Sequence, residues 1–279
     1  MIARHAAFQH VPLERQLKMK WVPEAEAAIK KVPFFVRKKV RSRVENDAAA
    51  AGKEVVSLAD VKATQARFMA KMSSEIKGYQ VDTCFGSGGC PNPANSGNSL
   101  FKKIEGFLEK EDLLSFMKQR VKGDVKFHHE FKVTLAECPN ACSQPQIKDI
   151  GIIGACKPLL TDETCTICEA CVDECKENAI SIKSESNMPE IDYNRCLACG
   201  KCIEVCPTCT IASDIKGFRV QLGGKLGRHP KLASELDGIF NEDEVLAIVG
   251  RCVGFYKKNS KHGERFAEIF KLSDFKNFI

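Results

Sequence analysis

Two runs of four closely spaced cysteines constrain this chain more than any other feature of its sequence. The first run begins at Cys165 with the spacing C-x2-C-x2-C-x3-C, and the second begins at Cys196, repeats that spacing and ends in Cys206-Pro207. Three thiolates at such short intervals wrap one face of a cubane, so the fourth thiolate must come from elsewhere in the chain. The spacing predicts two 4Fe-4S clusters. It disfavours a pair of zinc sites, because zinc ligands usually come as separated C-x2-C pairs.

The two runs resemble the cysteine motif of bacterial two-cluster ferredoxins, in which the last cysteine of each run binds the cluster of the other run. The first run ends in Cys175-Lys176 instead of Cys-Pro, a departure that leaves ligation unaffected. Small residues between the ligands let backbone N–H groups approach the sulfurs and tune the potential. The ligand sets are expected to interleave, with one cluster on Cys165, Cys168, Cys171 and Cys206 and the other on Cys196, Cys199, Cys202 and Cys175.

Four further cysteines stand apart from these runs. Cys84 and Cys90 form C-x5-C, and after a gap of 47 residues Cys138 and Cys142 form C-x3-C. Glycines between the first two allow a tight loop around a bulky ligand. We interpret the four cysteines as the ligands of a third iron–sulfur cluster. On spacing alone, a zinc site built from two cysteine pairs, or four unrelated thiols, are the alternatives.

The composition is that of a globular protein. Of 279 residues, 44% are hydrophobic and 28% are charged, which excludes disorder, collagen and low complexity. Fifteen cysteines are too sparse for a small disulfide scaffold, so in a reducing cytosol the clustered ones are metal ligands. The sequence has neither a run of about 18 apolar residues nor the apolar region of a signal peptide. We therefore expect a soluble, cytoplasmic protein without a membrane span.

The net charge does not favour nucleic acid as a partner. Lysine and arginine total 42 against 36 aspartate and glutamate, for a formal net charge of +6. A 4Fe-4S core with four thiolates carries about −2, so three clusters would bring the folded protein close to neutrality. We expect no nucleic-acid binding, and we attribute the surplus cations to ordinary surface and to anion-binding positions.

The second group of cysteines lies in a longer resemblance. The stretch Glu137–Ala155, the loop Gly217–Pro230 and the stretch Lys261–Arg265 resemble, in this order, the sulfite and nitrite reductases that use sirohaem. The resemblance spans roughly residues 78–275. It is greatest to the anaerobic and dissimilatory sulfite reductases, which also carry an inserted ferredoxin domain.

This resemblance implies a role for each cysteine of the group. Cys142 would also bridge to the sirohaem iron, which makes it the catalytic residue. The bridge would let the cluster deliver electrons one at a time, while the opposite face of the iron stays open for the anion. The implied ligands of this 4Fe-4S cluster are Cys84, Cys90, Cys138 and Cys142.

The same resemblance points to three haem contacts. Asn140 matches a haem contact of the family. Sirohaem carries many carboxylates, and Lys225 and Arg228 lie in a glycine-rich loop whose N–H groups and cationic side chains suit them. The alternative for Lys225 and Arg228 is an exposed basic turn.

The segment 19–72 lacks cysteine and is predicted to be helical. Pro23 and Pro33 each open a helix, and Ser57-Leu-Ala-Asp60 is a capping box that opens a third. The pattern from Trp21 to Glu45 resembles a small helical domain at the end of one of the subunits of light-independent protochlorophyllide reductase. In that family the domain lies near a tetrapyrrole. The alternative is a three-helix docking module with a basic solvated face.

The predicted fold class is α+β, with a helical module, a mixed α/β sirohaem-reductase half-domain and an inserted two-cluster ferredoxin domain. A helix is expected over Phe101–Lys118, strands over Val125–Leu135 and Asp149–Gly154, and C-terminal helices over Glu244–Lys257 and Gly263–Leu272. The expected divisions are 1–18 as an extension, 19–74 as the helical module, 75–158 plus 213–279 as the reductase domain, and 159–212 as the insert.

Several further residues have less specific predictions. Cys156, Cys209 and Cys252 are predicted to be buried thiols, with a ligand role as the alternative for Cys209. His128 and His129 are expected to be ordinary strand residues, and a haem pocket is the alternative for them.

Together these features predict a sirohaem-dependent oxidoreductase that reduces sulfite, or else nitrite. Electrons from a donor protein or reductase subunit would pass through the two ferredoxin clusters. The family half that carries most anion-binding residues has no counterpart here, so no substrate-binding side chain can be assigned. A second copy of the chain or a partner subunit would complete the pocket. The alternatives are an electron-transfer subunit without sirohaem and a protein that acts on another tetrapyrrole.

Overall fold

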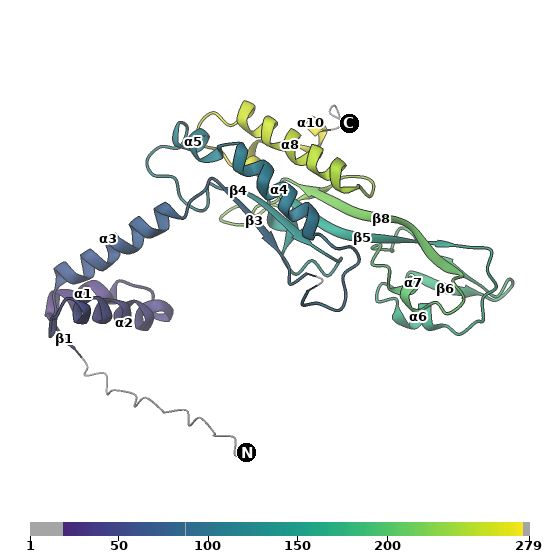
Figure 1. The fold of residues 1–279 in the computed structure, drawn as a ribbon, viewed down its shortest axis with the longest axis horizontal. Coiled ribbons are helices and arrows are strands. Elements are labelled where there is room, and N and C mark those ends of the chain that lie inside the picture. The colour runs from purple at the N-terminus through teal and green to yellow at the C-terminus, as the bar shows by residue number, and fades with distance from the viewer. Residues whose placement is uncertain (1–18, 87, 276–279) are drawn as a thin grey trace, which may run out of the picture. The chain divides into compact units, whose positions relative to one another are not determined.

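The computed structural model describes residues 19–86 and 88–275 (Figure 1). The chain divides between Glu75 and Ile76 into two compact units. Each unit has its own core and is described by itself.

The first unit is a three-helix module with a small strand pair. Its helices are α1 (Pro23–Lys30), α2 (Phe34–Ala50) and α3 (Leu58–Ser74), and β1 (Lys20–Trp21) pairs in parallel with β2 (Val55–Val56). The predicted capping box is confirmed, because Ser57 Oγ accepts from the Asp60 N–H at 3.3 Å and Asp60 Oδ2 accepts from the Ser57 N–H at 2.9 Å. The core residues are Ala25, Val44, Ala48 and Val56.

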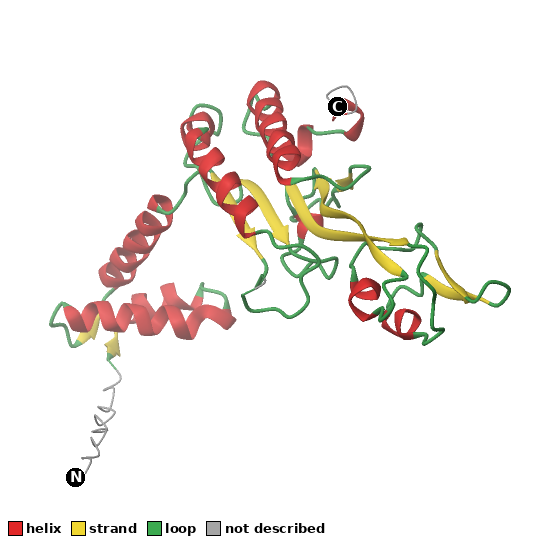
Figure 2. Cartoon of the chain, turned by 45° about the vertical axis from the view of Figure 1, so that its right-hand side comes forward, coloured by secondary structure: helices red, strands yellow, loops and turns green. Residues whose placement is uncertain are grey.

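The second unit is built on a five-stranded mixed sheet in the order β3-β4-β5-β8-β9 (Figure 2). β3, β4 and β5 run parallel to one another, whereas β8 and β9 are antiparallel to their neighbours. The carboxyl ends of β3 and β4 meet at one edge, where Cys84 and Cys138 follow. The strands are β3 (Tyr79–Thr83), β4 (Phe131–Ala136), β5 (Ile150–Leu160), β8 (Ile211–Leu222) and β9 (Ser234–Glu235).

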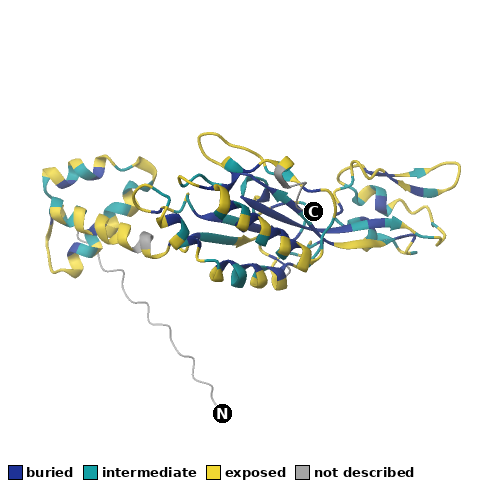
Figure 3. Cartoon of the chain, turned by 90° about the horizontal axis from the view of Figure 1, so that it is seen from above, coloured by how far each residue is buried: buried dark blue, intermediate teal, exposed yellow. Residues whose placement is uncertain are grey.

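Helices cover one face of this sheet. α4 (Asn98–Lys110) packs on β3, and α8 (Glu242–Asn259) packs on β8. Alternate strand residues point into this layer, and the buried residues follow the central strands (dark blue in Figure 3). The opposite face is more polar, and the one-turn helix η1 (Pro145–Ile147) crosses it against Gly151. A Cβ at Gly151 would lie 2.4 Å from the Pro145 carbonyl oxygen, so only glycine permits this approach.

β5 and β8 continue beyond the sheet as a long antiparallel pair that carries the residues between them. Their pairing runs from Ile150 opposite Leu222 to Leu160 opposite Ile211. The residues between them, 161–210, form what we call the insert. It contains α6 (Ala170–Glu174), the hairpin of β6 (Ile180–Lys183) and β7 (Met188–Ile191), and α7 (Lys201–Val205).

Three predicted elements differ from the structure. β4 begins only at Phe131, because residues 125–130 turn, with the His129 N–H donating to the Lys126 carbonyl at 2.8 Å. The helix predicted to end at Lys118 breaks at Asp112, whose φ of 42° starts a separate helix, α5 (Leu113–Lys118). The last predicted helix is two single turns, α9 (Phe266–Ile269) and α10 (Leu272–Phe275). Among the described residues, no helix is long and apolar enough to cross a membrane.

Candidate iron–sulfur and substrate site

The two cysteine runs of the insert follow the same backbone path. Ile167 and Ala198, at equivalent positions, both have φ of 55°, and Glu169 and Gly200 are likewise left-handed before a short helix. The left-handed residue turns its N–H back onto the first cysteine of the run. The Ile167 N–H donates to Cys165 Sγ at 3.3 Å, and the Ala198 N–H donates to Cys196 Sγ at 3.4 Å. Such N–H···S bonds favour thiolate ligands. Ile167 shows that a small side chain is not needed for this geometry.

The structure brings the insert cysteines together in the interleaved sets predicted from the sequence. Burial raises the pKa of Cys171, and the neighbouring thiols of Cys206, Cys165 and Cys168 raise it further. Burial raises the pKa of Cys202 to about 12, with added contributions from Cys199, Cys196 and Cys175. Four thiols that oppose one another's ionisation need a positive core to become thiolates together. The donor sets therefore fit iron–sulfur clusters.

The other four cysteines also meet at one place. Cys84, Cys90, Cys138 and Cys142 line a cavity of about 360 Å³ at the carboxyl ends of β3 and β4. Burial raises the pKa of Cys138, and Cys142, Cys84 and Cys90 contribute in the same direction. The Glu137 N–H donates to Cys84 Sγ at 3.4 Å. This set also fits a cluster held by four thiolates.

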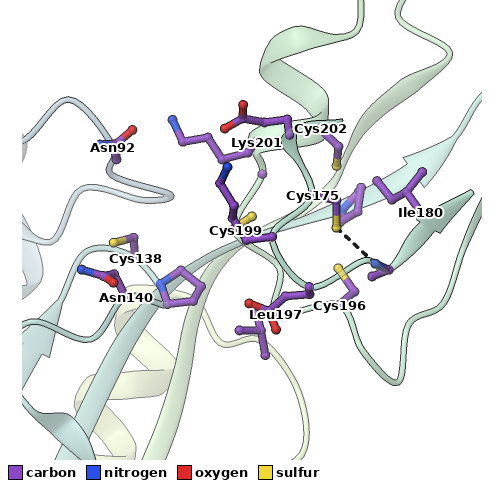
Figure 4. Close-up of a pocket in the computed structure, with 17 residues that line it drawn as sticks. Asn92, Cys138, Asn140, Cys175, Ile180, Cys196, Leu197, Cys199, Lys201 and Cys202 are labelled. Carbon is purple, nitrogen blue, oxygen red and sulfur yellow. Dashed lines mark hydrogen bonds between the residues drawn. The ribbon is translucent and has the colours of Figure 1, made fainter. Parts of the chain in front are cut away.

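A second cavity joins the two regions. It has a volume of about 340 Å³, and it is lined by Cys138 and Asn140 as well as by Cys175, Cys196, Cys199 and Cys202. Figure 4 shows Cys138 and Asn140 on one side and Cys175 and Cys196 on the other. The set of Cys165 lines a separate, smaller cavity. The Cys196 set is therefore the one that faces the Cys138 region.

Hydrogen bonds hold the insert against the β5–β8 pair. The Cys156 N–H donates to the Ala198 carbonyl at 2.7 Å, and Arg219 Nη1 donates to the Leu197 carbonyl at 3.1 Å. Both carbonyls belong to the second cysteine run. The position of the Cys196 set is thus fixed by the strands themselves.

Asn140 and Cys142 interact directly. The Asn140 side-chain amide donates to Cys142 Sγ at 2.9 Å. Cys142 is exposed, and Asn140 lies at both the 340 Å³ and the 360 Å³ cavities. The predicted haem contact is thus placed beside the predicted bridging sulfur.

Lys225 and Arg228 lie elsewhere, in the loop after β8. Lys225 Nζ pairs with Glu268 Oε1 at 2.8 Å, and the Lys225 side chain is only 16% exposed. Arg228 is exposed. Neither residue lines the two cavities around Cys138.

The remaining cysteines and histidines give mixed outcomes. His128 and His129 lie in a turn before β4, so the prediction that they are strand residues is wrong. Cys156 and Cys252 are buried as predicted, but the prediction for Cys209 is wrong, since its thiol is exposed. Cys209 is left-handed at the position equivalent to Asn178, three residues after the last cysteine of its run. The cavity of the Cys165 set is lined without it. Among the described residues, no group of three or more His, Cys, Asp or Glu side chains is arranged for a single metal ion.

Sequence reasoning missed Glu137. Its side chain is 2% exposed, its Oε1 accepts the Gly97 N–H at 2.8 Å, and it lines the 360 Å³ cavity. The only signal in the sequence was an acidic residue directly before Cys138 in an otherwise apolar strand end. Its role is to hold Gly97, and with it the start of α4, against the cysteine loop.

Two known protein families match the chain, one in each unit. Residues 77–279 match the family described as nitrite and sulphite reductase 4Fe-4S domain. The chain belongs to this family. Residues 21–65 match a second family, described as proto-chlorophyllide reductase 57 kD subunit. Both resemblances noted in the sequence are therefore confirmed, and the chain is of the iron–sulfur oxidoreductase kind found in the nitrite and sulphite reductase family.

Each individual relative in the nitrite and sulphite reductase and protochlorophyllide reductase families matches only part of this chain. The chain is 29% identical over 153 residues to the coenzyme F420-dependent sulfite reductase of Methanocaldococcus jannaschii, a match that covers 54% of this chain and 24% of that protein. It is 49% identical over 53 residues to one polypeptide of the light-independent protochlorophyllide reductase of Pelodictyon phaeoclathratiforme, covering 19% of this chain and 10% of that polypeptide. The crystal structure of dissimilatory sulfite reductase I aligns with a TM-score of 0.48 at 17% identity, over 71% of this chain and 50% of that one.

Proposed function

We propose that this chain is the cluster-bearing part of a sirohaem-dependent reductase of sulfite or nitrite. One observation carries the proposal: Cys138, of the family's cysteine set, and Cys196, of the insert, line the same cavity. Twelve cysteines in three sets match the ligand count of three 4Fe-4S clusters. When bound, the clusters would supply one-electron transfer, and the sirohaem would supply the iron that takes the anion.

The residues of the chain have distinct proposed roles around these groups. Cys84, Cys90, Cys138 and Cys142 would hold one cluster, and Cys142 would also be its link to the sirohaem. Asn140 orients the Cys142 sulfur through its hydrogen bond. Lys225 and Arg228 are the proposed partners of sirohaem carboxylates, which requires Lys225 to exchange its pairing with Glu268.

We propose that electrons enter at the outermost of the three sets and pass inward. The Cys165 set is the outermost, because it does not share the cavity with Cys138. Cys168 is exposed, and the neighbouring Ile167 is 44% exposed, so a donor can approach this set. Residues 159–212 contain ten aspartates and glutamates against four lysines and arginines. We propose a donor protein or reductase subunit with a basic docking face, in the cytoplasm.

The proposal also requires a second polypeptide at the haem. The chain covers about a quarter of the F420-dependent relative. A second copy of this chain, or a partner subunit, would supply the anion-binding half of the pocket.

The deciding experiment is a visible spectrum of the anaerobically purified protein, together with sulfite- and nitrite-dependent oxidation of reduced viologen. The proposal predicts a strong Soret band, a band in the red and turnover of one of the two anions. Replacing Cys142 with Ser should uncouple haem and cluster while leaving the insert clusters intact. A spectrum with only a broad brown shoulder would instead favour an electron-transfer subunit without sirohaem. The existing Lys225–Glu268 pair is the observation that favours this second candidate.

A further inference from the structure

The three-helix unit contains a large groove that the proposed chemistry does not use. The groove has a volume of about 1120 Å³ and lies among α1, α2 and α3. Its floor includes Val36, Val40, Val61, Phe68 and Met69. Phe68 and Met69 are 43% and 50% exposed, so this apolar surface is open to solvent.

The two longer helices line the groove with one face each, regularly apolar on α2 and interrupted on α3 by Thr64 and Gln65. Val36, Val40 and Val44 follow one another at intervals of four on α2, and Val61 and Phe68 lie two turns apart on α3. The stretches 36–44 and 61–69 are each about 12 Å long at the helical rise. A guest helix about 10 Å across would fill about 900 Å³ over that length. The groove therefore matches about two turns of a fourth helix, and it exceeds the usual size of small-molecule pockets, up to about 1,000 Å³.

The charges around the groove are unbalanced, whereas three other cations of the unit are paired with carboxylates. Arg41 pairs with Glu26 at 2.8 Å, Lys53 with Asp60 at 2.6 Å, and Arg67 with Asp47 at 2.9 Å. None of these cations lines the groove.

Four exposed cations do line the groove, against a single acid, Glu24. In the part of the chain that the structure describes, none of the four forms an ion pair with a carboxylate. Arg43 instead stacks over the Phe68 ring at 4.7 Å, which leaves its charge available. The four are Lys31, Lys39, Arg43 and Lys62.

We propose that this groove binds an amphipathic helix of a partner protein, with acidic side chains on both sides of its apolar stripe. The apolar stripe of the guest covers the valines and Phe68, and its carboxylates pair with the four cations of the rim. This is helix-in-groove recognition, and it would complete a four-helix arrangement. Charge thus lets the groove discriminate between helices, since a basic helix would meet the like charges of the rim.

The test uses the full chain, purified anaerobically, and a fluorescent helical peptide of about 15 residues. The peptide has leucines at helical spacing and glutamates on both flanks, and a second peptide carries lysines in place of the glutamates. Fluorescence anisotropy should show binding of the acidic peptide at least tenfold tighter than that of the basic one. Binding should weaken as salt is added.

Matched variants locate the site. The double variant Lys39→Glu with Arg43→Glu should weaken the acidic peptide at least tenfold. Lys38→Glu should leave binding unchanged, because Lys38 is equally exposed on α2 but does not line the groove. Ala27→Trp, which fills the groove at an exposed position, should also abolish binding, with circular dichroism reporting that the helices remain.

Several results would overturn the proposal. If the acidic and basic peptides bound equally well, the argument from charge would fail. It would also fail if Lys38→Glu weakened binding as much as the double variant does. If the groove binds oleate and neither peptide displaces the oleate, the groove would be assigned to a small amphiphile. Self-association abolished by Ala27→Trp, without peptide binding, would assign it to a second copy of the chain. None of these readouts depends on sirohaem or on anion reduction.

Discussion

The side-chain amide of Asn140 donates to the Cys142 sulfur at 2.9 Å. Hydrogen bonds to ligand sulfurs stabilise the more negative, reduced state of a cluster and so raise its reduction potential. We predict that Asn140→Leu lowers the potential of the cluster on Cys142. Loss of a hydrogen bond worth about 1 kcal/mol corresponds to a shift of about 40 mV for one electron. A redox titration followed by electron paramagnetic resonance measures it, with the potentials of the insert clusters as internal controls. An unshifted potential would show that the amide does not act on the ligand sulfur.

The interleaving of the insert cysteines gives a second prediction. Cys175→Ser should remove the cluster of the Cys196 set and leave that of the Cys165 set, because Cys175 lies with Cys196, Cys199 and Cys202. Iron content should fall by about four atoms out of about twelve in the three clusters. Cys209→Ser is the matched control, since this exposed thiol lines none of the cysteine cavities and should keep all of its iron. Equal loss in both variants would contradict the assignment.

Electron exchange at the outer cluster should depend on charge. A basic cytochrome c should oxidise the dithionite-reduced protein faster at low salt than at high salt, because the insert is acidic. The variant Glu163→Gln with Glu169→Gln should slow this reaction about twofold to fivefold at low salt, as expected when two charges are removed from a steering surface. Glu105→Gln on α4 should have no effect. Stopped-flow absorbance gives the rates, and a rate independent of salt would argue against an acidic docking face.

Asp149 predicts a pH dependence of stability. Complete burial raises the pKa of this carboxyl to about 6, and Arg265 only partly offsets the effect. The folded state therefore holds the proton more tightly than the unfolded state, so stability falls as pH rises from about 4 to about 6 and then levels off. Asp149→Asn should remove that loss and stabilise the protein above pH 6 by up to about 3 kcal/mol.

Thermal unfolding of the parent protein and of Asp149→Asn between pH 4 and pH 8 checks this prediction. The quantity to compare is the difference in unfolding temperature between the parent and the variant at each pH, because loss of the clusters affects both proteins alike. Oδ2 of Asp149 accepts the Lys132 N–H at 2.9 Å, and an asparagine oxygen can keep that bond. A variant that is less stable than the parent at every pH would mean that the ionised carboxylate stabilises the fold through Arg265.

Much of the site was predictable because cysteine spacing is a local property. The interleaved insert sets follow from the short ferredoxin motifs, whereas the meeting of Cys84 with Cys138 was implied by the family resemblance, and the structure groups both sets as expected. Helix starts at prolines and at the Ser57 capping box were predictable for the same reason. Local rules are sufficient where the deciding contacts are a few residues apart.

Other features depended on contacts distant in sequence. The cavity shared by Cys138 and Cys196 arises from the length and register of β5 and β8, which no motif encodes. The pairing of Lys225 with Glu268 joins the loop after β8 to α9, 43 residues further along the chain. The break at Asp112 required a left-handed aspartate, which the apolar periodicity of the surrounding helix concealed.

The antiparallel pair of β5 and β8 has a consequence for how such a protein could diversify. Both ends of the insert leave from the same rung of the ladder, Leu160 opposite Ile211, so a stiff strand pair carries the insert instead of a flexible tether. Lengthening or shortening that strand pair by two residues on each strand would keep every side chain on its own face while moving the insert cysteines by about 7 Å. The spacing between redox centres could thus be retuned in discrete steps, without any change to the cysteines themselves.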